Sequence, residues 1–177
     1  MVRPEVPKWL LLASDFPPEI AAMSNDLLVR PVTRQDYEQW LPLWDGYNAF
    51  YGRSGATALP DKITQVTWTR FFDDHEPVYA LVAEAHGKLV GLAHYLFHRS
   101  TIHVEPVCYL QDLFTSETAR GKGVGGALIT AVYDHAKRAG STRVYWQTHE
   151  TNIIAQQLYN KMAQRNGFIV YHHRLHR

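Results

Sequence analysis

A glycine-rich segment, which joins an expected strand to an expected helix, constrains the fold of this chain more than any other stretch. Residues 109–115 are rich in aromatic and branched side chains, which predicts a strand. After Gly123 the apolar residues recur at helical spacing until Gly140, which predicts a helix between these glycines. A helix that begins among glycines presents unpaired backbone N–H groups and its positive dipole end. We therefore expect this segment to bind phosphate.

Two nucleotide-binding motifs can be compared with this segment. Gly121, Gly123 and Gly126 match the G-x-G-x-x-G dinucleotide fingerprint. Residues 127–177 are too few for the sheet of such a fold, so a dinucleotide-dependent enzyme is only an alternative reading. The nucleoside-triphosphate loop is excluded because Lys122 is not followed by Ser or Thr.

The order Arg120-Gly121-Lys122-Gly123-Val124-Gly125 fits another pattern, Arg-x-x-Gly-x-Gly. It resembles the coenzyme A pyrophosphate loop of the GNAT superfamily of N-acyltransferases. Residues 110–114 resemble the strand before that loop. Asn152, Ala155, Leu158 and Tyr159 resemble the later helix of the family. The branch that this chain resembles most acetylates polyamines and histone-tail lysines.

The resemblance covers residues 27–177 and implies one N-acetyltransferase domain, preceded by an N-terminal extension over residues 1–26. The implied fold is α/β (α+β), with a mixed, largely antiparallel sheet of about six to seven strands, a parallel splayed central pair and about four flanking helices. The residue pattern predicts strands at 27–30, 78–84, 89–97, 109–115, 143–148 and 168–174. It predicts helices after the capping sequence 33–36, at 60–72, after Gly123 and after Asn152. Pro42 should kink or split the first of them.

The resemblance also implies the chemistry, which is transfer of an acetyl group from acetyl-CoA to a primary amine by direct attack in a ternary complex. The acceptor would be a polyamine, a lysine side chain or another small amine. Tyr159 matches the family's general acid, and a backbone N–H within 113–115 would polarise the carbonyl. The implied cofactor-binding residues are Leu113, Phe114, Thr115, Arg120, Gly121, Lys122, Gly123, Val124, Gly125, Gly126, Asn152 and Tyr159. A non-catalytic acyl-CoA-binding or sensor module is the alternative.

The resemblance does not supply the base that deprotonates the amine. Polyamine-type relatives carry Glu-Asp in the central strand, whereas this chain has Gln111-Asp112. We expect Asp112 to act as the base, with Glu105, Glu150 and His149 as alternatives. The missing glutamate removes one anion that would bind a polyamine.

Residues 44–51 are unusually rich in aromatic side chains. The first reading is an ordinary core stripe on a helix. The second is a wall that binds a cationic amine through ring faces and a carboxylate. The candidate substrate-binding residues are Trp44, Asp45, Tyr47, Tyr51 and Gln111.

Composition excludes several other classes of protein. A net charge of +1 gives no basic field for nucleic acid, and no apolar run is long enough for a membrane span. The single cysteine, Cys108, suits a reducing compartment and a buried thiol, so we expect a cytoplasmic protein. We expect no metal site, because His94, His98 and His103 match no zinc spacing. The family resemblance implies a homodimer or homotetramer.

Overall fold

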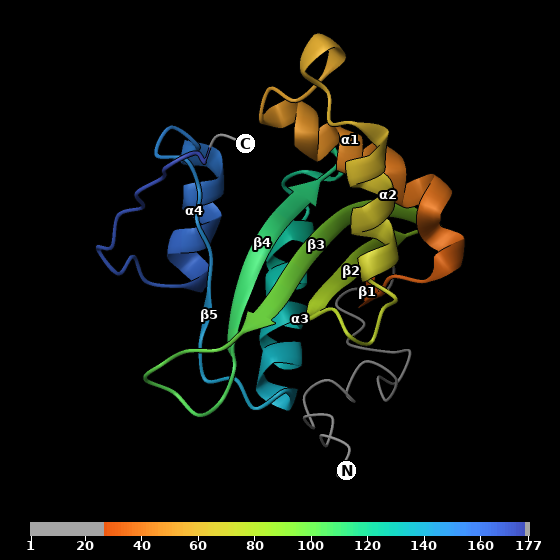
Figure 1. Ribbon diagram of the computed structural model, residues 1–177. Coiled ribbons are helices and arrows are strands. Elements are labelled where there is room, and N and C mark those ends of the chain that lie inside the picture. Colours follow the sequence, from red (N-terminus) through yellow and green to blue (C-terminus); the bar gives the residue numbers. More distant parts are fainter. Residues whose placement is uncertain (1–26, 176–177) are drawn as a thin grey trace. The chain divides into compact units, whose positions relative to one another are not determined.

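Five strands form one sheet in the order β1-β2-β3-β4-β5, and the computed structural model describes residues 27–175 (Figure 1). The predicted extension over residues 1–26 lies outside the described residues. The chain divides into two units, one that ends at Gln147 and one that begins at Thr148. The prediction of one domain over residues 27–177 stays a prediction.

The sheet is mostly antiparallel, as predicted. Its strands are β1 (Leu27–Pro31), β2 (Val78–Ala85), β3 (Lys88–His98), β4 (Val107–Thr115) and β5 (Val144–Tyr145). The first three pairings are antiparallel, and β4 pairs with β5 in parallel. The β2–β3 hairpin turns at His86 and Gly87, both of which have positive φ angles of 51° and 73°, as a two-residue turn requires.

The predicted number of about six to seven strands was too high for the described residues. Residues 168–174 form no strand, because their backbone groups find no neighbouring strand with which to form a ladder. The predicted strand at 143–148 is reduced to the two residues of β5. As a result the parallel pair lies at the edge of the sheet and not at its centre.

The splaying of the parallel pair is confirmed. β5 contacts β4 only where Cys108 faces Val144 and Tyr109 faces Tyr145. β4 continues to Thr115, so residues 110–115 have no strand partner on that side within the described chain. This open edge can accept hydrogen bonds from, or donate them to, an extended ligand.

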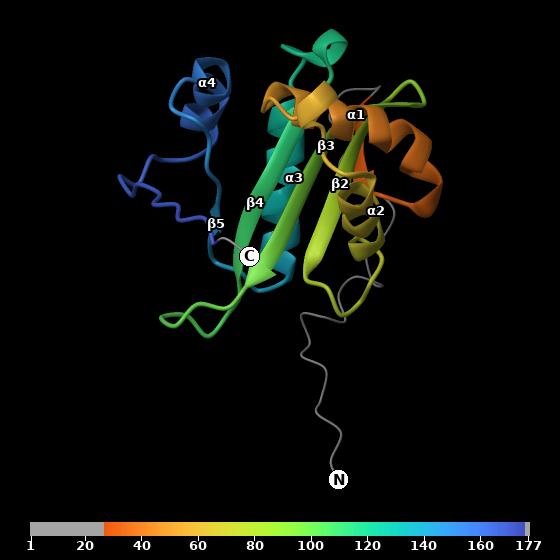
Figure 2. The same cartoon turned by 45° about the horizontal axis from the view of Figure 1, so that its top comes forward.

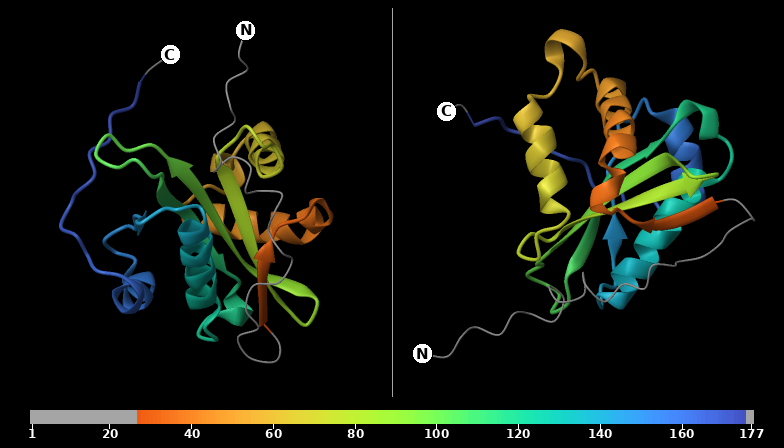
Figure 3. Two further views of the ribbon diagram at one scale, coloured as in Figure 1. Left: turned by 90° about the horizontal axis from the view of Figure 1, so that it is seen from below. Right: turned by 90° about the vertical axis from the view of Figure 1, so that its right-hand side faces the viewer.

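The four α-helices of residues 27–175 agree with the predicted number of about four. α1 (Tyr37–Phe50), α2 (Asp61–Arg70) and α3 (Val124–Arg138) belong to the first unit, and α4 (Ile153–Met162) belongs to the second. α1 and α2 cover one face of the sheet and α3 covers the other (Figures 2 and 3). None of the helices in residues 27–175 is long and apolar enough to cross a bilayer.

α1 continues through Pro42 as one helix, so of the two predicted effects, a kink or a split, the split was wrong. Proline removes one backbone hydrogen bond, but Trp40, Leu43 and Trp44 on either side of it are buried against the sheet. The indole rings of Trp40 and Trp44 stack 5.7 Å apart, and Trp68 of α2 lies 4.8 Å from Trp40. Tertiary packing of these large rings therefore outweighs the local preference.

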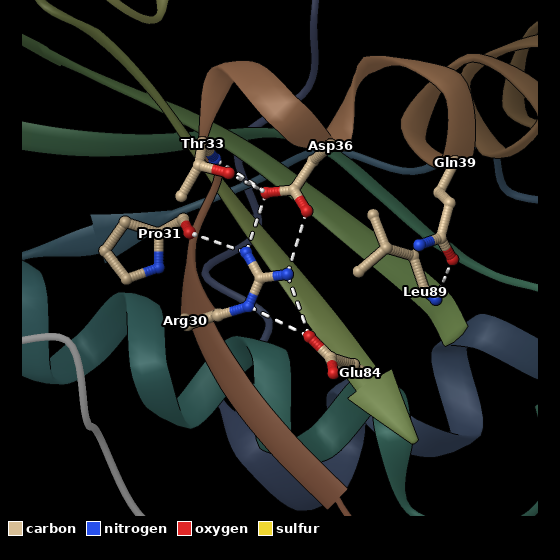
Figure 4. Close-up of polar contacts among 7 residues, drawn as sticks. All are labelled: Arg30, Pro31, Thr33, Asp36, Gln39, Glu84 and Leu89. Atoms are coloured by element: carbon tan, nitrogen blue, oxygen red, sulfur yellow. Dashed lines mark hydrogen bonds and ion pairs between the residues drawn. The ribbon is translucent and has the colours of Figure 1, made fainter. Parts of the chain in front are cut away.

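Arg30 of β1 fixes the start of α1 on the sheet (Figure 4). Its two terminal nitrogens donate to the two carboxylate oxygens of Asp36 at 2.7 and 2.8 Å, and its Nε donates to Glu84 of β2 at 3.0 Å. Burial opposes ionisation of Asp36, but hydrogen bonds from Arg30 and Thr33 outweigh it and lower the pKa of Asp36. The Thr33 N–H bond to Asp36, 2.7 Å long, completes the predicted cap.

Candidate active site

A β-bulge in β4 determines which way Asp112 points. Opposite β3, Asp112 pairs with His94 and Leu110 pairs with Tyr95, so Gln111 is an extra residue with no partner. The bulge shifts the alternation of the strand by one residue. Consequently Asp112 faces α1 on one side of the sheet, while the side chain of Gln111 is exposed.

Asp112 is buried and bonded to a histidine whose tautomer is fixed. Trp40 Nε1 can only donate, and it lies 3.0 Å from His94 Nε2, which must therefore be the acceptor. The proton of His94 is then on Nδ1, which donates to Asp112 Oδ2 at 3.0 Å. The chain of donors runs from Trp40 through His94 to the carboxylate and orients it rigidly.

Phenol groups surround the same carboxylate. The pKa of Tyr47 is raised, first by burial and then by its interaction with the nearby Asp112 carboxylate. The pKa values of Tyr51 and Tyr109 are raised by burial and also by Asp112. A carboxylate with phenol groups around it is a suitable place for an ammonium group.

The structure brings together only some of the predicted substrate residues. Tyr47 and Tyr51 lie beside Asp112, with their ring centroids 5.1 Å apart. Trp44 is 6% exposed, its indole N–H donates to Thr64, and its ring lies 5.3 Å from that of His94. Asp45 lies on the exposed side of α1. The core reading is therefore correct for Trp44, whereas amine binding by Tyr47 and by Tyr51, which is 40% exposed, stays a prediction.

The glycine loop follows directly from β4. A short 3-10 turn (Glu117–Ala119) leads to Arg120, which is exposed and lies 3.5 Å from Glu117, and to Lys122, which is also exposed. Gly121 and Gly123 have φ angles of 74° and 82°, which favour glycine, and the space that a Cβ would enter is open at both.

The first turn of α3 leaves backbone amides available. The first i→i−4 bond of the helix runs from Ala127 N to Gly123 O, so the amides of Val124, Gly125 and Gly126 precede the ladder. Gly91 of β3 allows α3 to approach the sheet, because a Cβ there would lie 3.0 Å from Val124 Cγ1 and 2.9 Å from Phe114 O. These amides and the open loop form a site that suits a diphosphate.

The end of β4 adds the remaining predicted cofactor residues of this unit. Leu113 pairs with Ala93 and Thr115 pairs with Gly91 on the β3 side. The ring of Phe114 turns toward α1, since a Cβ on Gly46 would lie 2.8 Å from Phe114 Cζ. Any contact of Phe114 with an extended ligand along the open edge is therefore expected through its backbone.

The second unit contains the other two predicted cofactor residues. Asn152 caps α4, because its Oδ1 accepts a bond from Ala155 N at 3.4 Å and its Nδ2 donates to Thr148 Oγ1 at 3.2 Å. Tyr159 lies on α4, and its carbonyl accepts from Ala163 N at 2.8 Å. The cap is confirmed, and the roles of Asn152 and Tyr159 toward the cofactor stay predictions.

The alternative bases and the thiol are placed as follows. Glu105 is exposed in the loop between β3 and β4, and His149 is exposed and bonded to Thr151 at 2.8 Å. Glu150 is exposed in the second unit. Cys108 is fully buried, as predicted, and burial raises the pKa of its thiol to about 12, so it is a poor nucleophile.

Sequence reasoning missed the partners that organise Asp112. It named His94 only in excluding a zinc site and did not connect it with Asp112 or with Trp40. It also passed over Arg53 and Asn48, which lie beside the tyrosines. An imidazole in the middle of an apolar strand was the available signal, since a buried polar group needs partners.

Comparison with known proteins agrees with this geometry. The sequence profile of the Acetyltransferase (GNAT) family matches residues 37–163. The D-amino-acid N-acetyltransferase HPA3 of Saccharomyces cerevisiae is 38% identical over 152 residues, which cover 84% of this chain and 92% of that protein. An uncharacterized N-acetyltransferase of Bacillus subtilis, YhfO, is 28% identical over 81% of this chain and 94% of its own length.

Solved structures share the fold at low identity. The aminoglycoside N-acetyltransferase AAC(6')-Iy in complex with CoA has a TM-score of 0.71 at 19% identity, over 88% of this chain and 99% of that one. The profile match covers most of this chain and includes the glycine loop and the Asp112 strand. This chain therefore belongs to the GNAT family of acetyltransferases and is an acetyl-CoA-dependent N-acetyltransferase.

Proposed function

We propose that the chain acetylates the primary amine of a small molecule by direct attack within a ternary complex. Acetyl-CoA supplies an activated acyl group, in which the bond that breaks joins the carbonyl carbon to sulfur. The observation that carries the proposal is the position of Asp112, a buried and oriented carboxylate three residues before the end of the strand that leads into the glycine loop. One strand thus provides a site for the amine and leads to a site for the diphosphate.

Each proposed role belongs to a particular group of this chain. The amides of 121–126 hold the diphosphate, and the backbone of Leu113, Phe114 and Thr115 orients the acyl arm along the open edge. Asp112 attracts the ammonium form of the acceptor and takes the proton that must leave before attack. Tyr159 returns a proton to the departing sulfur, so that charge is balanced when the C–N bond forms and the C–S bond breaks.

The acceptor is a small amine of a class that sequence alone left open. A polyamine or a lysine side chain stays a candidate from the family resemblance. Gln111 weakens the polyamine reading, because it is exposed and neutral where relatives place an anion. The HPA3 relative is named for D-amino acids, which adds amino acids to the candidates. The predicted homo-oligomer and cytoplasmic location also stay proposals that rest on the resemblance and composition.

A thiol-release assay with a panel of amines tests the proposal. The panel spans spermidine, a lysine peptide, an aminoglycoside, and D- and L-amino acids, each with acetyl-CoA. We expect acetylation of at least one small amine and, in Tyr159→Phe, a kcat lowered by about 10- to 100-fold with little change in KM for acetyl-CoA. Tight acetyl-CoA binding with no thiol release from any amine would instead favour the sensor module.

A further inference from the structure

Arg53, which follows α1, is held in place by a buried amide. Its backbone N–H donates to Asn48 O at 2.9 Å, and its Nε donates to Asn48 Oδ1 at 2.7 Å. Asn48 is 4% exposed, and its Nδ2 donates to Trp44 O at 2.9 Å, which fixes the direction of its amide. The arginine is therefore oriented before any ligand binds.

The rest of the guanidinium is positioned but not bonded. Its Cζ lies 5.7 Å from the ring centroid of Tyr47 and 5.3 Å from that of Tyr51. Within residues 27–175, its two terminal nitrogens have no hydrogen-bond acceptor. A planar cation that is stacked on rings and held at Nε presents its outer N–H groups as a fork for a carboxylate.

Opposite charges thus border the same pair of tyrosines. Tyr47 lies near Asp112 and under the guanidinium of Arg53. The Asp112 charge raises the pKa values of Tyr47 and Tyr51, whereas the Arg53 charge lowers both, after burial, which has the largest effect. A ligand that lies along these two rings therefore meets an anion and a cation.

We propose that the acceptor is a free amino acid, bound through its carboxylate by Arg53 and through its amine by Asp112. This inference rests on the proposed acetyl transfer. A polyamine has no carboxylate, and its further positive charges would be repelled by Arg53. A lysine within a peptide has no carboxylate near its ε-amine either. The arrangement selects for a molecule that carries both charges.

Matched pairs of acceptors test this inference. Lysine is compared with cadaverine and phenylalanine with phenethylamine, because each amine is the amino acid without its carboxylate. D- and L-forms are both included, together with glycine, β-alanine and γ-aminobutyrate to vary the separation of the charges. We expect the wild-type enzyme to prefer the amino acid of a pair by at least about 10-fold in kcat/KM.

Variants of Arg53 then test whether the preference for amino acids depends on this side chain. In Arg53→Gln, kcat/KM for the amino acid should fall by about 10- to 100-fold, while the value for the amine without a carboxylate and the KM for acetyl-CoA stay unchanged. Arg53→Lys should lose less, since it keeps the charge but not the fork. Arg34→Gln is the control, because Arg34 also stacks on a ring, 4.6 Å from the centroid of Phe72.

The possible outcomes separate the inference from the function on which it rests. Equal losses in Arg53→Gln for amino acids and simple amines would show that Arg53 only balances the charge of Asp112, and would overturn the inference. So would equal use of both members of a pair by the wild-type enzyme. Thiol release with none of the amines would overturn the proposed function as well.

Discussion

Two buried histidines lie on opposite faces of the sheet and differ in what surrounds them. His94 of β3 is 3% exposed and faces α1, where it links an indole N–H to a carboxylate. His135 of α3 is 2% exposed, and its Nδ1 lies 2.7 Å from the hydroxyl of Tyr95, the neighbour of His94 along the strand. Adjacent strand residues thus lead to two polar clusters on two faces.

The clusters differ in their connection to charge and to the surface. The His94 cluster includes the Asp112 carboxylate. Beyond Asp112 lie Tyr47 and then Tyr51 and Arg53, which are partly exposed. In the His135 pair, burial lowers the pKa of the imidazole to about 4, with a further contribution from the Arg138 charge. The comparison indicates that the His94 cluster, which contains a carboxylate and reaches partly exposed residues, is the better candidate for a functional site.

The largest expected effect is the loss of activity in Asp112→Asn. The amide can still accept from His94, so the fold should persist, but it can neither attract an ammonium nor take its proton. We expect kcat/KM to fall by about 10²- to 10⁴-fold, measured by thiol release, with a small change in thermal midpoint. Asp134→Asn on α3 makes the same chemical change on the other face and should retain activity. Similar losses in the two variants would break the comparison.

On the other face, the expected effect is on stability and depends on pH. The pKa of His135 is about 4 in the folded state, against 6.5 for the unperturbed imidazole, so between these values the unfolded chain binds a proton that the folded chain does not. The free energy of unfolding should be unaffected above pH 6.5 and fall by roughly 2 to 3 kcal/mol as the pH drops toward 4.

Urea unfolding of the wild type and His135→Gln at several pH values measures this effect. The variant lacks the titrating group, so the difference in unfolding free energy between the two proteins should narrow as the pH falls. His103→Gln, in an exposed loop, should keep the wild-type slope. A slope that is the same in all three proteins would contradict the assignment to His135.

Much of this arrangement could be predicted from local sequence, because local backbone chemistry fixes it. The glycines around 121–126, the end of α3 at Gly140 and the Asn152 cap all follow from φ angles and unpaired amides that need particular residues. The short parallel pair and the unpaired residues 168–174 could not be predicted, since strand pairing depends on distant residues.

The organisation of Asp112 shows the same limit. The bulge at Gln111 depends on the register between β3 and β4, and nothing in residues 107–115 alone specifies it. Without the bulge, Asp112 and Leu110 would share a face, and the link to His94 would not be expected. Arg53 was missed because its importance comes from Asn48 and the tyrosines around it, and not from a motif.

The smallest expected effect tests whether the Trp40 N–H positions the cluster. Trp40→Phe keeps a ring in the stack but removes the donor to His94 Nε2, so the imidazole can adopt either tautomer and Asp112 is oriented less well. We expect kcat to fall by about 3- to 10-fold with the KM for acetyl-CoA unchanged, in line with one lost hydrogen bond. Trp68→Phe makes the same change in a second indole, whose ring centroid lies only 4.8 Å from that of Trp40. The N–H of Trp68 does not bond to His94. If both variants lose the same fraction of kcat, the loss reflects packing, and His94 has no positioning role that depends on Trp40.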